Sequence, residues 1–148
     1  MPSSGKPGVS DSCRILGELW HLVASVMDEM EPSLEPLGLS YKAFMLLEAV
    51  AEHPFPAQLA RKLYVPPPTV TYLVKQLEEK GYLARRSEAG DLRKFRLVQT
   101  PEGLEALRKG VEAFAAISSE RTGRLSPEEL ASFEGMIGRL SPPRDGKG

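Results

Sequence analysis

The chain is poor in the residues that build disulfide frameworks and metal sites. It has one cysteine, Cys13, two widely separated histidines, His21 and His53, and no asparagine. A single cysteine excludes an internal disulfide and fits a reducing compartment such as the cytoplasm. Two isolated histidines do not form a metal-binding pattern. We therefore expect no metal or other cofactor.

Long apolar runs are also absent from the sequence. No run approaches the roughly 20 residues of a membrane-spanning helix, and the opening MPSSGKPGVSDSC lacks the apolar core of a secretory signal. No pair of carboxylates, nucleophile site or Gly-rich phosphate loop is apparent, so we do not expect an enzyme. The 148 residues, 41% hydrophobic and 26% charged, indicate one globular domain or subunit.

Charge is distributed unevenly along a chain whose net charge is only −1. Residues 1–56 carry three Lys or Arg against eight Asp or Glu, residues 57–100 carry nine against four, and residues 101–148 carry seven against eight. A basic middle third in an otherwise acidic chain indicates a polyanionic partner for that segment. A solvated charged face explains the charges alone equally well.

Capping residues and apolar periodicity predict three helices in the first part of the chain. Residues 1–10 are rich in Ser, Gly and Pro and are expected to be disordered. Asp11 or Ser12 is expected to cap a long helix whose apolar residues recur at steps of three and four as far as the glycine at position 38. Ser40 is expected to cap a second helix, and Pro56 to open a short third one, AQLARKL.

The segment PPPTVTYLVKQLEEKG predicts a fourth helix with two distinct faces. Its buried face has the i, i+3, i+4, i+7 spacing in Val70, Leu73, Val74 and Leu77. The opposite face displays Thr69, Thr71, Tyr72, Lys75, Gln76 and Glu79. Two short helices of this kind form a helix-turn-helix pattern, whose second helix enters the DNA major groove.

A basic hairpin is predicted next, because YLARRS and RKFRLVQ alternate like strands and Gly90 suits the turn between them. Asp91 and Arg93, two positions apart, share a strand face and can pair. An Arg held in this way at a hairpin tip suits the narrow minor groove of DNA. The alternative is a surface ion pair contributing about 0–1 kcal/mol.

Two further helices close the chain. Thr100 and Pro101 open the first, with an apolar stripe made of Leu104, Leu107, Val111, Phe114 and Ala115. Ser126 and Glu129 form a capping box at the start of the second. The first and last helices carry more apolar surface than a chain of this size can cover, which predicts a helical dimer interface. The alternative is a self-contained bundle.

The segment LARKLYVPPPTVTYLVKQLEEKGYLARR, followed by GDLRKFRLVQTPEG, resembles the winged helix-turn-helix of the MarR family of bacterial transcriptional regulators. The D-L-R stretch (Asp91–Arg93) and TPEG (Thr100–Gly103) resemble its wing signature and the helix that follows. Two departures are Gln99, where the family usually has leucine, and Pro66–Pro68, where it tends to have small polar residues.

The resemblance implies a mainly α fold with a small β-hairpin. Residues 1–10 would be a disordered segment and 142–148 a flexible tail. Residues 40–100 would form the winged helix-turn-helix DNA-binding domain, and 11–39 with 101–141 the dimerisation region. A cytoplasmic homodimer would bind pseudo-palindromic operator DNA as a repressor, relieved by a small aromatic or lipophilic effector.

The resemblance also assigns roles to residues. Base or phosphate contacts are expected from Thr69, Thr71, Tyr72 and Lys75. Contacts with the backbone phosphates of DNA are expected from Lys62, Arg85, Arg86, Lys94 and Arg96. Arg93, oriented by Asp91, would enter the minor groove. Pro67 and Pro68 fit the first turn of the fourth helix, where they remove N–H donors and offer apolar contact to thymine methyl groups.

Effector binding and redox sensing are two further hypotheses. Ligand contacts are expected, if anywhere, from Trp20, His21, Tyr41 and Phe44, although aromatic residues on helices are more often core. Cys13 lies near a helix N-terminus beside Arg14, and both features favour a reactive thiolate. A plain thiol is the more economical explanation. A winged helix used only for protein contacts is the remaining rival, and the five cations of the hairpin count against it.

Overall fold

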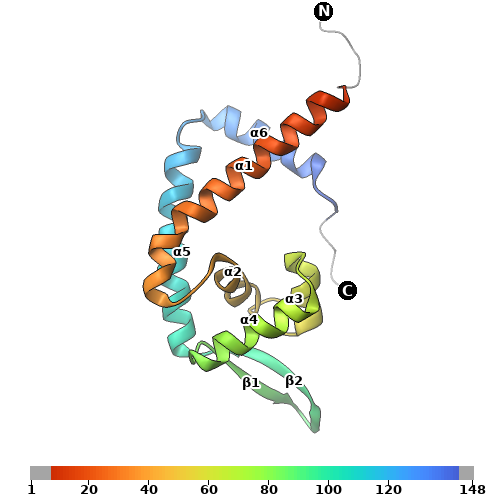
Figure 1. Ribbon diagram of the computed structural model, residues 1–148, viewed down its shortest axis with the longest axis vertical. Coiled ribbons are helices and arrows are strands. Elements are labelled where there is room, and N and C mark those ends of the chain that lie inside the picture. The colour runs from red at the N-terminus through yellow and green to blue at the C-terminus, as the bar shows by residue number, and fades with distance from the viewer. Residues whose placement is uncertain (1–7, 144–148) are drawn as a thin grey trace, which may run out of the picture.

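The computed structural model describes residues 8–143, apart from the side chains of Leu92 and Arg93. In chain order the elements are α1 (Val9–Leu34), the 3₁₀ helix η1 (Glu35–Leu37), α2 (Tyr41–Ala49), α3 (Pro56–Leu63), α4 (Pro67–Glu79), β1 (Leu83–Glu88), β2 (Asp91–Gln99), α5 (Pro101–Thr122) and α6 (Pro127–Leu140). Helices α2–α4 and the hairpin form one lobe, from which α1, α5 and α6 extend (Figure 1). The predicted mainly helical class with one hairpin is confirmed.

The first helix begins earlier than the sequence predicts. Gly8, in extended backbone, precedes the first helical residue, Val9, and its carbonyl accepts a hydrogen bond from the Ser12 N–H at 3.1 Å. The expected cap at Asp11 or Ser12 is therefore wrong, because nothing between Gly8 and Asp11 interrupts the helix. Residues 1–7 of the segment expected to be disordered, and 144–148 of the expected tail, lie outside the described residues.

The long helix also ends before its expected terminator. α1 gives way to η1 at Glu35, and Gly38, with φ 65°, then ends the helical run. Pro36 lacks the N–H that a continuing α-helix would use, so the last turn tightens instead. The N–H of Leu39 closes this corner by donating to the carbonyl of Leu34 at 3.1 Å.

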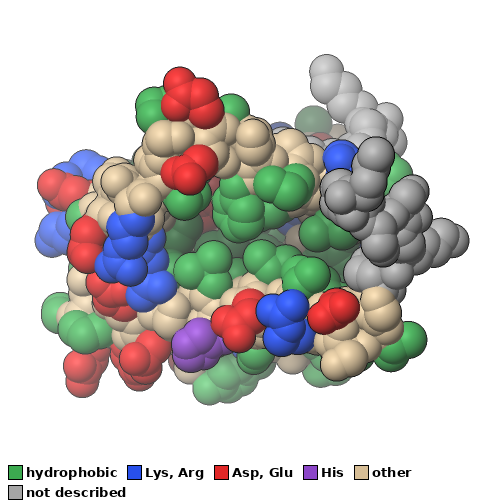
Figure 2. All heavy atoms as spheres, turned by 90° about the horizontal axis from the view of Figure 1, so that it is seen from above, with side chains coloured by type: hydrophobic (Ala, Val, Ile, Leu, Met, Phe, Trp, Pro, Cys, Tyr) green, Lys and Arg blue, Asp and Glu red, His purple; other side chains and the backbone are tan. Residues whose placement is uncertain are grey.

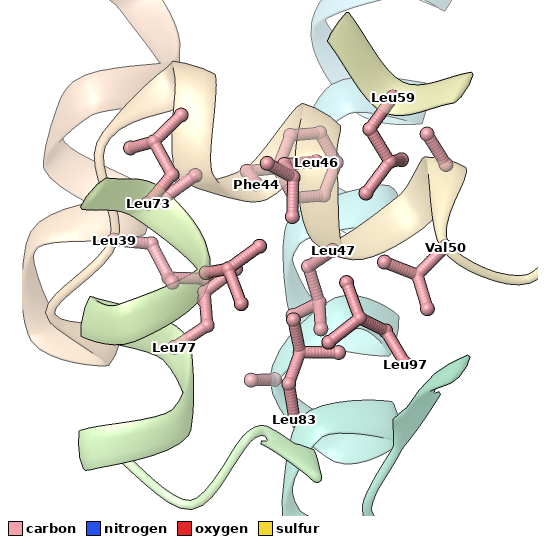
Figure 3. Packing of buried hydrophobic residues seen from close by; sticks show 14 of the residues in the cluster. Leu39, Phe44, Leu46, Leu47, Val50, Leu59, Leu73, Leu77, Leu83 and Leu97 are labelled. Atoms are coloured by element: carbon pink, nitrogen blue, oxygen red, sulfur yellow. The ribbon is translucent and has the colours of Figure 1, made fainter. Parts of the chain in front are cut away.

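The hydrophobic core lies where α2, α3, α4 and the base of the hairpin meet (Figure 3). Its fully enclosed side chains include Leu46, Leu47, Leu59, Leu77 and Leu97. The four residues predicted for the inner face of α4 are all buried, which confirms the phase of that helix. Ala51 is exposed, because α2 ends two residues earlier at Ala49.

The hairpin is anchored at its base and extends from the lobe at its tip (Figure 1). The strands pair antiparallel from Leu83 opposite Gln99 to Ser87 opposite Phe95, with an irregularity before Glu88. Leu83 and Leu97 are buried in the core. The N–H of Leu97 also donates to the carbonyl of Pro54 at 2.9 Å, which ties β2 to the segment before α3.

The junction between the hairpin and α5 is very tight. The predicted cap is confirmed, since the Thr100 hydroxyl accepts a hydrogen bond from the Gly103 N–H at 3.0 Å. The Thr100 N–H donates to the Tyr82 carbonyl at 3.1 Å. A Cβ at Gly103 would stand 2.1 Å from that carbonyl oxygen, so only glycine fits this approach.

Helix α5 turns small residues towards the core. The buried positions are Gly103, Ala106 and Gly110. The ring of Phe44 fills the space beside Gly110, where a Cβ would lie 2.5 Å from it. The predicted apolar stripe points elsewhere, with exposed fractions of 51% at Leu104, 44% at Val111 and 38% at Phe114. Much of the apolar surface of α5 is therefore left uncovered by this chain.

Helix α6 packs even less against the rest of the chain. Its predicted capping box is present, with both hydrogen bonds between Ser126 and Glu129 formed, but none of its residues is buried. A hollow of about 700 Å³ separates it from α1, lined on its apolar side by Leu22, Leu125, Phe133 and Met136. Figure 2 shows hydrophobic side chains gathered in the hollow at this end of the molecule. Among the helices of residues 8–143, none combines the length and apolarity required to cross a membrane.

Candidate nucleic-acid interface

Helices α3 and α4 form the predicted helix-turn-helix, and α4 presents a polar face outward. Val70, Leu73 and Val74 hold the helix on the core, so the residues between them must face solvent. Thr71, Tyr72 and Lys75 are exposed, and Thr69 is half-buried. The Tyr72 hydroxyl accepts a hydrogen bond from Gln76 Nε2 at 2.9 Å, which orients both side chains on this face.

The N-terminus of α4 has almost no N–H groups to offer. Pro66 is the N-cap residue, Pro67 and Pro68 form the start of the helix, and no side chain caps it. The first N–H, that of Thr69, donates to the Pro66 carbonyl at 2.9 Å, and the next, that of Val70, donates to the same oxygen at 3.2 Å. The predicted loss of free donors is confirmed, so an anion cannot bind here through backbone amides.

Tyr64, in the turn before α4, is a feature that the sequence reasoning missed. It ends α3 with φ 53° and ψ 39°, and it is the one residue other than glycine with positive φ in the described part of the chain. Its side chain is 83% exposed. An L-residue pays about 1 kcal/mol or more for this left-handed conformation. A turn between the two helices can be predicted from the sequence, but the hydrophobic pattern does not indicate the backbone angle of Tyr64.

The outer face of the hairpin carries cations. Arg86 stands opposite Arg96 in the register, and Lys94 lies two residues from Arg96 on β2, so the three share one face. Arg96 lies 4.0 Å from the Glu88 carboxylate, a marginal pair. Among the described side chains, Arg86 and Lys94 make no ion pair, nor do Lys62 on α3 and Lys75 on α4. These four cations remain available to a polyanion.

Arg85 is occupied within the chain. Its Nε donates to Glu78 Oε1 on α4 at 2.9 Å, and a second guanidinium nitrogen lies 2.9 Å from the same carboxylate oxygen. The guanidinium carbon also lies 4.4 Å from the ring centroid of Phe95 on β2, in cation–π geometry. Arg85 thus joins α4 to both strands of the hairpin. Its predicted role at a DNA phosphate has to compete with these contacts.

The expected pairing of Asp91 with Arg93 concerns a side chain outside the described residues. The backbone of both lies at the start of β2, directly after Gly90, whose φ of 84° makes the turn. Asp91 is half-buried and engaged in an interaction. The minor-groove role of Arg93 stays a prediction.

Gln99, the departure noted at the end of the hairpin, has a structural role. Its Nε2 donates to the carbonyl of Leu47 on α2 at 2.7 Å, and its side chain is half-buried. The amide therefore replaces apolar packing under the hairpin by a hydrogen bond between β2 and α2.

The four candidate effector contacts are not gathered around one cavity. Trp20 and His21 are exposed on α1, whereas Phe44 is buried in the core. Tyr41 lies beside Phe44, with ring centroids 6.2 Å apart, and burial raises the pKa of its hydroxyl. None of the four lines the hollow beside α6 or the smaller one of about 420 Å³ beside Tyr82 and α5.

Cys13 is an exposed free thiol on α1. The described residues around it supply no cluster of three or more His, Cys, Asp or Glu that could hold a metal ion. The redox hypothesis for Cys13 therefore rests only on its place in the sequence.

Comparison with known proteins agrees with this architecture. A sequence model of the MarR family matches residues 37–94, which run from η1 to the hairpin. The putative transcriptional regulatory protein for the hcr operon of Thauera aromatica is 29% identical over 92% of this chain and 89% of its own length. The HTH-type transcriptional repressor Rv2887 of Mycobacterium tuberculosis is 28% identical over 90% of this chain and 97% of its own length.

Solved structures share the fold at lower sequence identity. A MarR mutant of E. coli complexed with operator DNA has a TM-score of 0.74 at 21% identity, over 92% of this chain and all of that one. The S. aureus MepR–DNA complex has a TM-score of 0.73 at 19% identity, over 82% of this chain and 91% of that one. The named relatives are regulators and not enzymes, as the sequence predicts. The chain thus resembles MarR-family regulators in its matched segment, in relatives along nearly its whole length and in its fold.

Proposed function

We propose that the protein is a homodimeric, sequence-specific DNA-binding repressor of transcription. The observation that carries the proposal is a set of exposed cations near α4 that make no ion pair among the described side chains, namely Lys62, Lys75, Arg86 and Lys94. Such cations suit a polyanion, and their position beside a helix-turn-helix suits duplex DNA. The relative Rv2887 is named a repressor, which supports the direction of regulation.

In this proposal α4 enters the major groove and the hairpin lies in the adjacent minor groove. Thr71, Tyr72 and Lys75 would meet base edges or nearby phosphates, and Arg93 at the hairpin tip would enter the minor groove. Arg86 and Lys94 would hold backbone phosphates, which position a protein without reading sequence.

A second copy of the chain is proposed to cover the uncovered apolar surface of α1, α5 and α6. Exposed apolar residues on these helices include Leu16, Trp20, Val111, Phe114, Ile137 and Leu140. Arg121 holds α5 against α1 through Ser25 Oγ at 2.7 Å and through Glu29, so both helices present a rigid surface. A two-fold dimer built on them would present two α4 helices to half-sites about 34 Å apart.

The proposal includes relief of DNA binding by a small aromatic or lipophilic effector. One solved structure of the same fold, the organohalide-sensing RdhR regulator, was determined with 2,4-dichlorophenol bound, at 16% identity and a TM-score of 0.73. A ligand that alters the packing of α1 and α5 against the DNA-binding lobe would change the distance between the two α4 helices. Trp20, His21, Tyr41 and Phe44 remain the candidate contacts.

The test is an electrophoretic mobility shift with the DNA upstream of this protein's own gene, at two salt concentrations, beside a scrambled duplex of equal length and composition. We expect retention of the upstream DNA that survives the higher salt, and loss of the scrambled complex. Sedimentation velocity of the protein alone should give a dimer. Equal retention of both duplexes contradicts specific binding, and a monomer at micromolar concentration contradicts the dimer.

A further inference from the structure

The turn that leads into α4 has an exposed apolar edge. It consists of Tyr64 and Pro66–Pro68, and all four side chains are exposed. Val65, between them, is half-buried and packs on the core, and its N–H donates to the Ala60 carbonyl at 3.1 Å. The alternation leaves Tyr64 and the prolines on the outside of the turn, next to the exposed face of α4.

The conformation of Tyr64 makes its exposure unusual. A residue at φ 53° is accommodated best by glycine, and asparagine also tolerates that region. Tyr64 contributes little to the core from there, since 83% of it is exposed and no hydrogen bond of its hydroxyl is recorded among the described residues. The left-handed conformation therefore destabilises the turn, and packing of the ring within this chain does not offset that cost.

We infer that Tyr64 determines sequence specificity, by packing with Pro66–Pro68 against thymine methyl groups in the major groove. The inference rests on the proposed DNA binding. Each element of the edge is apolar, and the start of α4 has no free N–H to attract a phosphate. Thymine is the base that displays a methyl group in the major groove, so an apolar edge there discriminates thymine from the other bases.

The charges around the edge are compatible with this role. Lys62 precedes Tyr64 by two residues, and Lys75 lies two turns into α4; both are exposed, and no ion pair is recorded for either among the described side chains. They can hold the DNA backbone on both sides of the edge. Contact with the duplex would then bury the ring of Tyr64, which is the gain that offsets the strained turn.

The test compares wild type with Tyr64→Gly, Tyr64→Asn and Tyr64→Phe, on operator DNA and on the same duplex with thymine replaced by uracil. Uracil lacks only the methyl group. We expect wild type and Tyr64→Phe to lose about fourfold in affinity for each contacted methyl removed. Tyr64→Gly and Tyr64→Asn should bind thymine DNA about tenfold more weakly than wild type, and should lose less affinity than wild type on uracil substitution, because only the prolines still contact methyl groups. Thermal unfolding should show both variants at least as stable as wild type.

Three outcomes separate the possibilities. If wild type does not retain upstream DNA specifically, the proposed function itself fails. If wild type binds specifically and Tyr64→Gly and Tyr64→Asn match it, Tyr64 makes no contact and this inference is overturned. If both variants lose affinity but respond to uracil as strongly as wild type does, Tyr64 does not read the methyl group, and the inference is again overturned.

Discussion

Arg85 on β1 is held by Glu78 on α4, with Nε and the carboxylate oxygen 2.9 Å apart, and lies over the ring of Phe95 on β2. The pair joins the end of α4 to the hairpin, the two elements proposed to enter neighbouring grooves. Since the Arg85 side chain is 48% exposed, solvent screens the pair and its direct contribution to stability is small. Its consequence is geometric, because it joins α4 to both strands of the hairpin.

Arg85→Ala should therefore weaken specific binding without removing a phosphate contact. We expect a loss of about three- to tenfold in operator affinity, because two elements that must dock together lose a shared orientation. The slope of log affinity against log salt should stay at the wild-type value. A slope reduced by about one would instead identify Arg85 as a phosphate contact, as the sequence suggested.

Lys94→Ala is the matched variant on the same hairpin. Lys94 makes no ion pair among the described side chains, so its loss should remove one counterion-release contact. Affinity should fall alike for operator and scrambled duplexes, and the salt slope should fall by about 0.9. Binding isotherms over a salt series measure both quantities, and a specific loss confined to the operator would argue against a phosphate role.

Replacing Pro66–Pro68 by Ser-Gln-Ser restores three backbone N–H groups and adds a capping side chain at the start of α4. Phosphates bind such helix N-termini through free amides. We expect higher affinity for unrelated duplexes and a narrower gap between specific and non-specific binding. A fall in affinity for every duplex would mean that the prolines position α4, and that their missing donors cost little.

Gly103→Ala should destabilise the fold through one contact. The new Cβ would stand 2.1 Å from the Tyr82 carbonyl oxygen, and backbone cannot move aside as a side chain can. Overpacking of this kind costs about 1–3 kcal/mol in the free energy of unfolding. Gly135→Ala is the control, since that helical glycine has no atom within 4 Å of the new Cβ and should gain about 0.5–1 kcal/mol. Urea unfolding of both variants measures the contrast, and equal effects would contradict the close approach.

Gln99→Ala should lower the free energy of unfolding by about 1 kcal/mol, because the Leu47 carbonyl loses its 2.7 Å hydrogen bond and the half-buried site loses side-chain volume. Gln99→Leu should cost less, since leucine restores apolar contact with α2 at the same place. Urea titration of both variants orders them. If leucine is the more damaging substitution, the hydrogen bond contributes more than the packing.

Local signals predicted the elements well where a side chain caps its own helix. Ser40, Thr100 and Ser126 each accept the predicted hydrogen bond from an N–H three residues on. Such bonds depend on neighbours in sequence, so sequence suffices to predict them. The start of α1 was misplaced by the same reasoning, because a competent cap at Asp11 does not stop a helix that can begin at Gly8.

The candidate site was predicted in part. The exposed face of α4 follows from the spacing of Val70, Leu73 and Val74. The contacts of Arg85 with Glu78 and Phe95 could not be predicted. They form only once the turn after α4 and the hairpin turn bring the three residues together. The left-handed conformation of Tyr64 could not be predicted for a related reason. Its positive φ comes from the turn between α3 and α4 and not from the preference of tyrosine itself.

Sequence by itself determined the order of helices and hairpin, the helix-turn-helix and the basic character of the middle third, because these depend on spacing, capping and charge along the chain. Tertiary structure decided which face of α5 became interior. Gly103, Ala106 and Gly110 point inward on α5, while Leu104, Val111 and Phe114 remain outside. Hydrophobicity would assign the opposite faces. The small residues are inside because Phe44 and the Tyr82 backbone already fill the space opposite them.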